Sequence, residues 1–253
     1  MAQPSISLRE RLADAKPFFF SWATAPSAVL AGQMARLPFE AVCIDMQHGL
    51  AGFPDAVEMA PAIVAQDKPL IIRVLWNEPG IIGQALDVGA RVIIAPMVNT
   101  AAEAAALVKS GKYPPQGMRS WGGYAAVQAA GLVPAAYLAE ANRLTMLFAM
   151  IETDEALDNL DRIAAVPGLD GLFVGPNDLS ISFGFGIGAD PKTPRIDTAL
   201  KKIVAAAKAN GLVPGVFGGS PDACRHYVGL GFRFIAAATD MNMLAAGAKA
   251  MQP

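Results

Sequence analysis

The chain has 253 residues, of which 53% are hydrophobic and 17% charged, and its formal net charge is -2. This composition excludes a disordered chain, since the apolar residues suffice for a sizeable core. The nearly balanced charge gives no indication of a nucleic-acid partner, and the length suits one large barrel or two small domains.

The amino-terminal residues and the cysteines indicate the cellular environment. Residues 1–16 contain no continuous apolar segment, so we expect no signal peptide. The apolar run over residues 16–32 is interrupted by prolines and polar residues and is too short to cross a bilayer. The two cysteines, Cys43 and Cys224, are too few for a disulfide framework. We therefore expect a cytoplasmic protein that has no membrane contact.

Eight short apolar runs recur along the chain, separated by longer Ala-rich segments with helical spacing. They lie at residues 18–22, 41–45, 70–74, 92–96, 147–151, 171–175, 214–218 and 232–236. Strands that are hydrophobic almost throughout are typical of a parallel sheet covered on both faces. Eight such strands alternating with helices predict an α/β fold, a single (β/α)8 TIM barrel domain that spans residues 1–253.

An open, doubly wound sheet is the competing architecture. Such sheets usually carry a glycine-rich phosphate-binding loop after the first strand, and residues 21–32 lack one. Local signals fit helices between the strands: Thr100 and Glu103 form a capping-box pattern, and Ser220 precedes a proline at a first helical position.

One long segment, residues 110–130, interrupts the alternation between the fourth and fifth strands. It is rich in glycine, proline and aromatic residues and includes Arg119, Trp121 and Tyr124. Long loops inside compact domains tend to be functional, so we expect this segment to cover the substrate.

Polar residues stand at or just past the carboxyl ends of several predicted strands. Asp45 ends the second strand and His48 follows it, while Arg73 lies near the end of the third. Glu152 directly follows the fifth strand, and Asp178 follows the sixth after a short turn. Since the carboxyl ends of barrel strands form the catalytic face, we expect these five side chains to meet at one mouth.

Glu152 and Asp178 come from strands that should be neighbours, roughly 4.8 Å apart. Two carboxylates in this arrangement can share a hard cation such as Mg²⁺ or Mn²⁺ and leave coordination positions for water or a chelating substrate. The alternative is that Glu152 is only a charge at a helix N-terminus, favoured by the helix dipole.

The other polar residues also allow two interpretations. Asp45 is close enough in sequence to orient His48 as a general base, whereas His226 lies in a helical surface context and is expected to be structural. Arg73 either forms an internal salt bridge with an acid such as Asp45 or faces the mouth and binds an oxyanion.

A turn and a helix end complete the candidate residues. Gly175, Pro176 and Asn177 begin a turn into a short helix, where free backbone N–H groups can bind an anion together with Asp178. Asp87 stands at the end of a predicted helix, where on its own it would be a solvated cap.

Taken together, these residues resemble the HpcH/HpaI family, the metal-dependent class II pyruvate aldolases of the aldolase/citrate lyase superfamily. The elements VGPNDLS and YPPxGxR are the most specific of the matches. The matching stretches are residues 41–49, 73–104, 113–120, 152–184 and 231–240.

The resemblance implies a metal site and a set of roles. Glu152 and Asp178 match the metal ligands, with Mg²⁺ or Mn²⁺ expected and Co²⁺, Zn²⁺ and Ni²⁺ as further candidates. The family's metal chelates pyruvate, polarises its carbonyl and stabilises the enolate. Asp45 and His48 match a pair that transfers protons with a metal-associated water, and Arg73 matches an arginine that steadies the keto oxygen.

The resemblance also implies an oligomer, a trimer or a hexamer. Asp87 matches an Asp that reaches in from a neighbouring subunit, and family members are commonly trimers of dimers that exchange a C-terminal helix. Two positions depart from the family pattern. Gln47 stands where many relatives have Glu, and Met150 stands where relatives often have a Gln that contacts pyruvate.

Three functions follow from these expectations. The first is reversible retro-aldol cleavage of a 4-hydroxy-2-oxo acid to an aldehyde and pyruvate or hydroxypyruvate, with aldehyde specificity set by residues 110–130, by residues 216–217 and by a neighbouring subunit. The second is cleavage of citryl- or malyl-type coenzyme A thioesters, disfavoured by the small size of the chain. The third is an inactive, assembled metal-binding scaffold. A Schiff-base mechanism is disfavoured, because no predicted strand contains a lysine.

Overall fold

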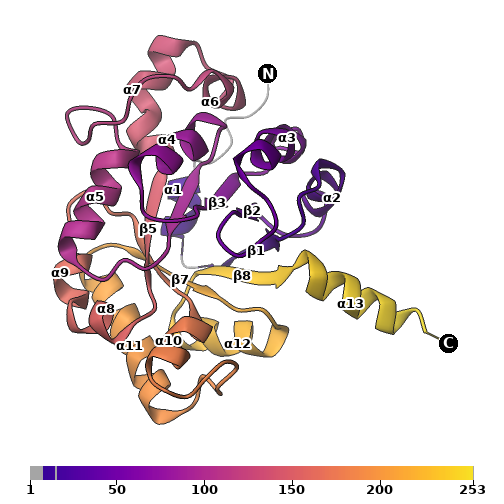
Figure 1. Cartoon of the computed structure of the whole chain (residues 1–253), viewed down its shortest axis with the longest axis vertical. Helices are drawn as coiled ribbons and strands as arrows, with labels where there is room; N and C mark the ends of the chain where they lie inside the picture. The colour runs from indigo at the N-terminus through magenta and orange to yellow at the C-terminus, as the bar shows by residue number, and fades with distance from the viewer. Residues whose placement is uncertain (1–7, 15, 253) are drawn as a thin grey trace.

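The eight predicted strands close into a barrel in the computed structural model, which describes residues 8–14 and 16–252 (Figure 1). All neighbouring strands are parallel and follow chain order until β8 pairs with β1. The strands are β1 (Phe18–Ala23), β2 (Val42–Asp45), β3 (Leu70–Arg73), β4 (Val92–Ala95), β5 (Met146–Ile151), β6 (Gly171–Val174), β7 (Val213–Phe217) and β8 (Phe234–Thr239). The predicted TIM barrel is confirmed.

The strand boundaries agree with the predicted runs to within three residues. The largest difference is at β8, which was expected to end at residue 236 and continues to Thr239. The additional residues pair with β1, where Ala238 lies opposite Ser21 and Thr239 opposite Trp22. Small alanine side chains gave no apolar signal there, and the pairing with β1 determines where the strand ends.

Helices connect the strands and surround most of the barrel (Figure 1). Thr100 and Ser220 cap α5 and α12 as predicted. The helices are α1 (Leu8–Ala13), α2 (Ala28–Met34), α3 (Phe53–Val64), α4 (Pro79–Asp87), α5 (Ala101–Gly111), α6 (Tyr124–Ala129), α7 (Pro134–Leu144), α8 (Asp154–Asp158), α9 (Leu160–Ala164), α10 (Pro176–Ser182), α11 (Pro194–Ala209), α12 (Pro221–Leu230) and α13 (Asp240–Ala250). No helix among the described residues is long and apolar enough to cross a membrane.

Alternate residues of the strands point into the barrel and form an inner core. β1 contributes Phe18, Phe20 and Trp22 to this core, whereas Phe19 packs on the outer side. Phe20 stacks on Phe234 of β8, with ring centroids 4.3 Å apart. Aromatic rings therefore fill the interior, which is a packed core and not a pore.

A second, larger core lies between the outer faces of the strands and the surrounding helices. The two cores are separated by the strands themselves, because successive side chains point to opposite faces. Leu12 of α1 packs with the inner core and α1 contacts α7, so the first described helix closes the amino-terminal end of the barrel.

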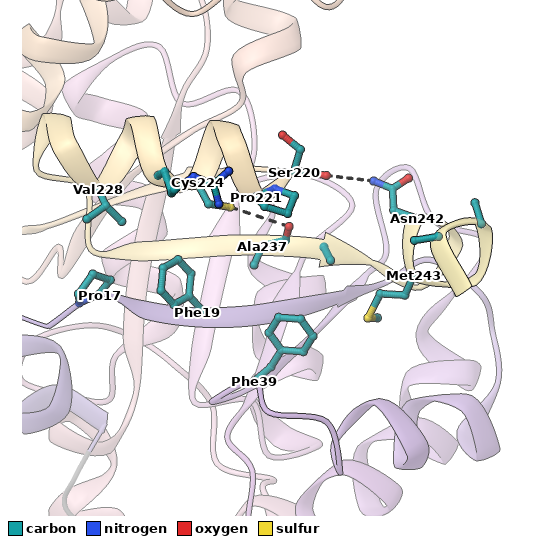
Figure 2. Close-up of a pocket in the computed structure, with 15 residues that line it drawn as sticks. Pro17, Phe19, Phe39, Ser220, Pro221, Cys224, Val228, Ala237, Asn242 and Met243 are labelled. Atoms are coloured by element: carbon teal, nitrogen blue, oxygen red, sulfur yellow. Dashed lines mark hydrogen bonds between the residues drawn. The ribbon is translucent and has the colours of Figure 1, made fainter. Parts of the chain in front are cut away.

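The last helix does not cover the strands that it follows. α13 projects away from the barrel (Figure 1), and Asp240, its first residue, is its only buried residue. A groove of about 850 Å³ is left along β8 and β1, between α12 and the segment that carries Phe39. Figure 2 shows Phe19, Phe39, Cys224 and Ala237 around this groove.

Candidate active site

The residues of β5 that face into the barrel are followed, at its mouth, by a carboxylate. Met146, Phe148 and Met150 all belong to the inner core, and Glu152 is the next residue in the same alternation. Its side chain is 2% exposed. The alternation that buries the apolar residues therefore also buries Glu152 above them, at the carboxyl end of the strand.

Asp45 and Arg73 form a buried ion pair in the same top layer. They lie directly opposite each other in the register of β2 and β3. Arg73 donates from Nε to Oδ1 at 2.8 Å and from Nη2 to Oδ2 at 2.6 Å, and its guanidinium lies 4.9 Å from the ring centre of Trp22. Of the two interpretations of Arg73, the salt bridge with Asp45 is present, and the binding of an oxyanion by Arg73 stays a prediction.

The environment of Asp45 favours its ionised form. Burial alone would raise the pKa of Asp45, but the hydrogen bonds and charge of Arg73 outweigh it. Hydrogen bonds from Trp22 and from the His48 backbone lower the pKa further, so it lies below its usual value.

His48 is exposed on the loop that follows β2. Asp45 Oδ1 accepts hydrogen bonds from the backbone N–H groups of Gln47, at 3.1 Å, and of His48, at 3.3 Å. The expectation that Asp45 holds the imidazole ring is therefore corrected: among the described contacts, Asp45 holds the loop backbone, because its carboxylate is already engaged by Arg73.

The carboxylate of Glu152 is held between two backbone segments. Met97, which follows β4 with a positive φ of 54°, donates its N–H to Oε1 at 2.7 Å. On the other side, a Cβ placed on Gly175 would lie 2.3 Å from Oε2 and 3.0 Å from Cε of Met150. Gly175 thus leaves the space that the carboxylate occupies beside β6.

Burial has the largest effect on the pKa of Glu152. It raises the pKa of Glu152 to about 7, and the charge of Asp178 contributes in the same direction, while the Met97 N–H and the charge of Arg73 oppose the rise. The charge of Asp178 therefore disfavours the ionised form of Glu152. A bound cation would relieve this repulsion, so the pair suits a metal ion.

The donor set supports the same conclusion. Two carboxylates are hard oxygen ligands, the type that Mg²⁺ and Mn²⁺ accept. The described residues contain no group of three or more His, Cys, Asp or Glu side chains arranged to hold a metal. A metal site formed by Glu152 and Asp178 alone therefore stays a prediction.

The turn after β6 places Asp178 at the mouth. Gly175 caps α10, Pro176 is its first residue and Asp178 lies in its first turn. Asn177 is exposed, and its Oδ1 accepts a hydrogen bond from the N–H of Gly188 at 3.2 Å. The predicted short helix is confirmed, and the substrate contacts of this turn stay a prediction.

Asp87 does not join the other candidate residues within its own chain. It ends α4, which begins beside the carboxyl end of β3 and returns toward the start of β4. Asp87 therefore lies at the amino-terminal end of the barrel, opposite the mouth. Its Oδ1 accepts a hydrogen bond from Nη2 of Arg119 at 2.7 Å, and its side chain is one-third exposed.

The expectation that residues 110–130 cover the substrate is wrong for the chain's own mouth. α5 begins at the mouth side and ends at Gly111, so the segment that follows it lies at the amino-terminal end of the strands. There Arg119 packs over Tyr113 and binds Asp87. Segments from a helix to the next strand always return to this end of a (β/α)8 barrel, and the sequence-based expectation overlooked this.

Several residues around the site carried no signal in the sequence. Met97 acts through its backbone, and only its positive φ, rare for a residue with a side chain, distinguishes it. Trp22 lies beneath Arg73 and contacts Phe217 edge-on, with ring centroids 5.3 Å apart. Trp22 thus lies just below the mouth, and it contacts Phe217 from the segment that was predicted to form the pocket rim.

The closed parallel barrel and the polar layer at the carboxyl ends of its strands define a barrel enzyme. Residues 19–246 match the family model HpcH/HpaI aldolase/citrate lyase. The chain is 38% identical, over 93% of both chains, to a hydroxypyruvate/pyruvate aldolase of Rhizorhabdus wittichii. It is 32% identical, over 97% of this chain and 92% of the relative, to a 4-hydroxy-2-oxo-heptane-1,7-dioate aldolase of Klebsiella pneumoniae.

A solved structure agrees with these matches. An HpcH/HpaI aldolase/citrate lyase family protein from Burkholderia cenocepacia superposes with a TM-score of 0.88 at 32% identity, over 97% of both chains. The chain belongs to the HpcH/HpaI aldolase/citrate lyase family. It is a carbon–carbon lyase of the aldolase type.

The raised pKa of Glu152 predicts a pH-dependent stability of the metal-free protein. Folding raises this pKa from 4.5 to about 7, so the folded state favours the protonated acid. The stabilisation is complete below pH 4.5 and is lost as the pH rises through about 7. With EDTA present, the Tm of wild type should fall between pH 5.5 and pH 8.5 by a few degrees more than the Tm of Glu152→Gln.

Scanning calorimetry across this pH range measures the effect. Glu155→Gln is the matched control, because Glu155 is exposed three residues further along. Identical Tm profiles for wild type and Glu152→Gln would contradict the assigned environment of Glu152.

Gly175 predicts a second, steric effect. In Gly175→Ala the new methyl group must displace the Glu152 carboxylate, because it would overlap Oε2. We expect the barrel to stay folded while Mn²⁺ affinity, measured by titration calorimetry, falls at least about 10-fold. Gly83→Ala serves as the control, since no atom lies within 4 Å of its added Cβ. Unchanged Mn²⁺ binding by Gly175→Ala would exclude Glu152 as a ligand.

Proposed function

We propose that this protein is a divalent-metal-dependent aldolase that reversibly cleaves 4-hydroxy-2-oxo acids to an aldehyde and pyruvate or hydroxypyruvate. The observation that carries the proposal is the pair of acids at the mouth, buried Glu152 and half-buried Asp178, whose charges repel. The named activities of the relatives, a hydroxypyruvate/pyruvate aldolase and a 4-hydroxy-2-oxo-heptane-1,7-dioate aldolase, support the substrate class. We also propose that the enzyme is cytoplasmic and that residues 1–253 form one barrel domain. Both cysteines are free thiols.

Glu152 and Asp178 are the proposed metal ligands. A bound Mg²⁺ or Mn²⁺ would supply Lewis-acid chemistry, drawing electrons from the keto group of the substrate. Co²⁺, Zn²⁺ and Ni²⁺ also accept carboxylate ligands and remain candidates for the same pair. The pKa of about 7 means that protons compete with the metal for Glu152 below neutral pH.

The remaining residues bind the substrate and move its protons. In the cleavage direction the C3–C4 bond breaks, the hydroxyl at C4 loses its proton, and the electron pair left at C3 takes up a proton to give pyruvate. His48, exposed at the mouth, is the proposed proton acceptor. Arg73, oriented by its two hydrogen bonds to Asp45, stabilises negative charge on the keto oxygen. The turn at residues 175–177 binds the substrate carboxylate through its backbone N–H groups, and Asp178 contributes to substrate binding as a proposed metal ligand.

Met150 shapes the base of this pocket. Its Cε lies close to Gly175 and its side chain is buried beneath Glu152, so it presents a thioether where a hydrogen-bonding side chain would contact the keto acid. We expect it to influence the choice between pyruvate and hydroxypyruvate. Phe217, at the end of β7 and packed against the inner core, lines the aldehyde side, whereas the Val216 side chain belongs to the outer core and faces the helices.

The test of this function is metal-dependent release of pyruvate. Purified protein should release pyruvate from a 4-hydroxy-2-oxo acid, lose this activity with EDTA and regain it with Mg²⁺ or Mn²⁺. A coupled lactate dehydrogenase assay measures the pyruvate that is released. Asp178→Asn should lower kcat/KM more than about 100-fold, because it removes a metal ligand. Asp158→Asn, on an exposed residue, is the control. The proposal fails if no 4-hydroxy-2-oxo acid yields pyruvate with metal present, and turnover of malyl-CoA alone would favour a thioester lyase.

We further propose that the enzyme is a homo-oligomer in which α13 of a second copy fills the groove along β8 and β1. The groove is apolar, and α13 carries Met241 and Leu244 exposed. Asn242 and Met243 of the chain's own α13 line one end of the groove, and the helix then projects away, so the rest of the groove suits a helix from a second copy (Figures 1 and 2). Asp87, at the far end of its own barrel, contributes to the mouth of a neighbour in this assembly.

Removing residues 244–253 tests the exchange. The truncated protein should sediment as a smaller species than wild type, because it lacks the helix that covers the groove. Cys224 lines the groove and should react faster with a thiol reagent in the truncated protein. Removing only residues 252–253 is the control. An unchanged sedimentation coefficient, once corrected for mass, would show that α13 does not hold the subunits together.

A further inference from the structure

Asp240, at the start of α13, is buried and carries four hydrogen bonds. Its side chain is about 1% exposed although it belongs to the most exposed helix of the chain. Oδ2 accepts the backbone N–H groups of Thr24 and Ala25, both at 2.8 Å. Oδ1 accepts the Thr24 hydroxyl at 2.6 Å and the N–H of Met241 at 2.9 Å. Both carboxylate oxygens of Asp240 therefore accept hydrogen bonds, two each.

Thr24, in turn, holds the loop that carries His48. The carbonyl of Thr24 accepts the N–H of Leu50 at 2.8 Å. Between these residues, a Cβ on Gly49 would lie 2.3 Å from the Asp45 carbonyl oxygen and 3.1 Å from that of Thr24. The loop is therefore fixed tightly on both sides of His48, by Asp45 at its start and by Thr24 at its end.

We propose that Asp240 is a positioning residue for His48, acting through Thr24. This inference rests on the proposed role of His48 as the proton acceptor. The contacts form one continuous connection: Asp240 fixes the backbone and hydroxyl of Thr24, and Thr24 fixes the end of the His48 loop. The exposed imidazole has no described partner of its own, so this backbone connection sets its position. The base of α13, the proposed exchanged helix, is thereby joined to the proton-transfer group.

Two reactions at the same site distinguish a misplaced His48 from a general loss of the active-site structure. Solvent hydrogen exchange at the pyruvate methyl group requires a base to remove a proton from carbon. Decarboxylation of oxaloacetate does not: the bond between C3 and the departing carboxylate breaks, carbon dioxide leaves, and C3 later takes a proton from solvent. Both reactions require the metal and the keto-acid contacts, but only the exchange depends on His48 as the acceptor.

Asp240→Asn and Thr24→Val are the test variants, assayed with Mn²⁺. In Asp240→Asn an NH₂ group must face donors, so the connection is broken. Thr24→Val removes only the hydroxyl contact and leaves Asp240 and α13 unchanged, so altered assembly cannot explain its effect. We expect kcat for methyl exchange, followed by NMR in D₂O, to fall about 10- to 100-fold for Asp240→Asn and less for Thr24→Val, with KM nearly unchanged. Oxaloacetate decarboxylation should stay close to wild type.

Two further variants complete the design. Thr24→Ser keeps the hydroxyl and should restore methyl exchange. Asp222→Asn is the matched control, since Asp222 is also an acid in the first turn of a helix, α12, but is exposed. If both reactions fall together in Thr24→Val, or if methyl exchange is unchanged in both variants, Asp240 does not position His48. If wild type catalyses neither reaction, the proposed function itself is wrong.

Discussion

The packing of aromatic rings inside the barrel is the constraint on which the site depends. Phe20 and Phe234 stack at its centre, and Trp22 closes the layer beneath Arg73. No charged group can be accommodated among these rings without a partner. The inward-facing positions become polar only at the carboxyl ends of the strands, where Asp45, Arg73 and Glu152 form the next layer. The mouth is therefore a consequence of how the core below it is filled.

The charges in this layer are not equally balanced. Arg73 forms a two-bond ion pair with Asp45, which lowers the pKa of that acid despite burial. Glu152 has a backbone N–H from Met97 and a repelling neighbour in Asp178, and its pKa rises to about 7. Asp45 is thus paired with an arginine by two hydrogen bonds, whereas Glu152 is repelled by Asp178 and has only a weaker effect from the charge of Arg73. This asymmetry distinguishes an orienting ion pair from a site suited to a cation.

The chain alone leaves two parts of the barrel unfinished. The outer faces of β8 and β1 lack a covering helix, and Asp87 with its partner Arg119 stands at the end away from the mouth. Both features fit a site completed by a second copy. Asp240 connects the base of α13, the helix proposed to be exchanged, to Thr24 and through Thr24 to the loop that carries His48.

The sequence alone determined the eight strands, their parallel order and the set of polar residues at their ends. It could do so because buried parallel strands need continuous apolar runs, and an acid such as Glu152 just after such a run must lie at the barrel mouth. Only the tertiary structure decided the contacts between distant segments. The backbone of Met97, the engagement of Asp45 by Arg73 and the placement of residues 110–130 at the opposite end all depend on register and on the direction of helices. These are properties of the closed barrel and not of any local run of residues.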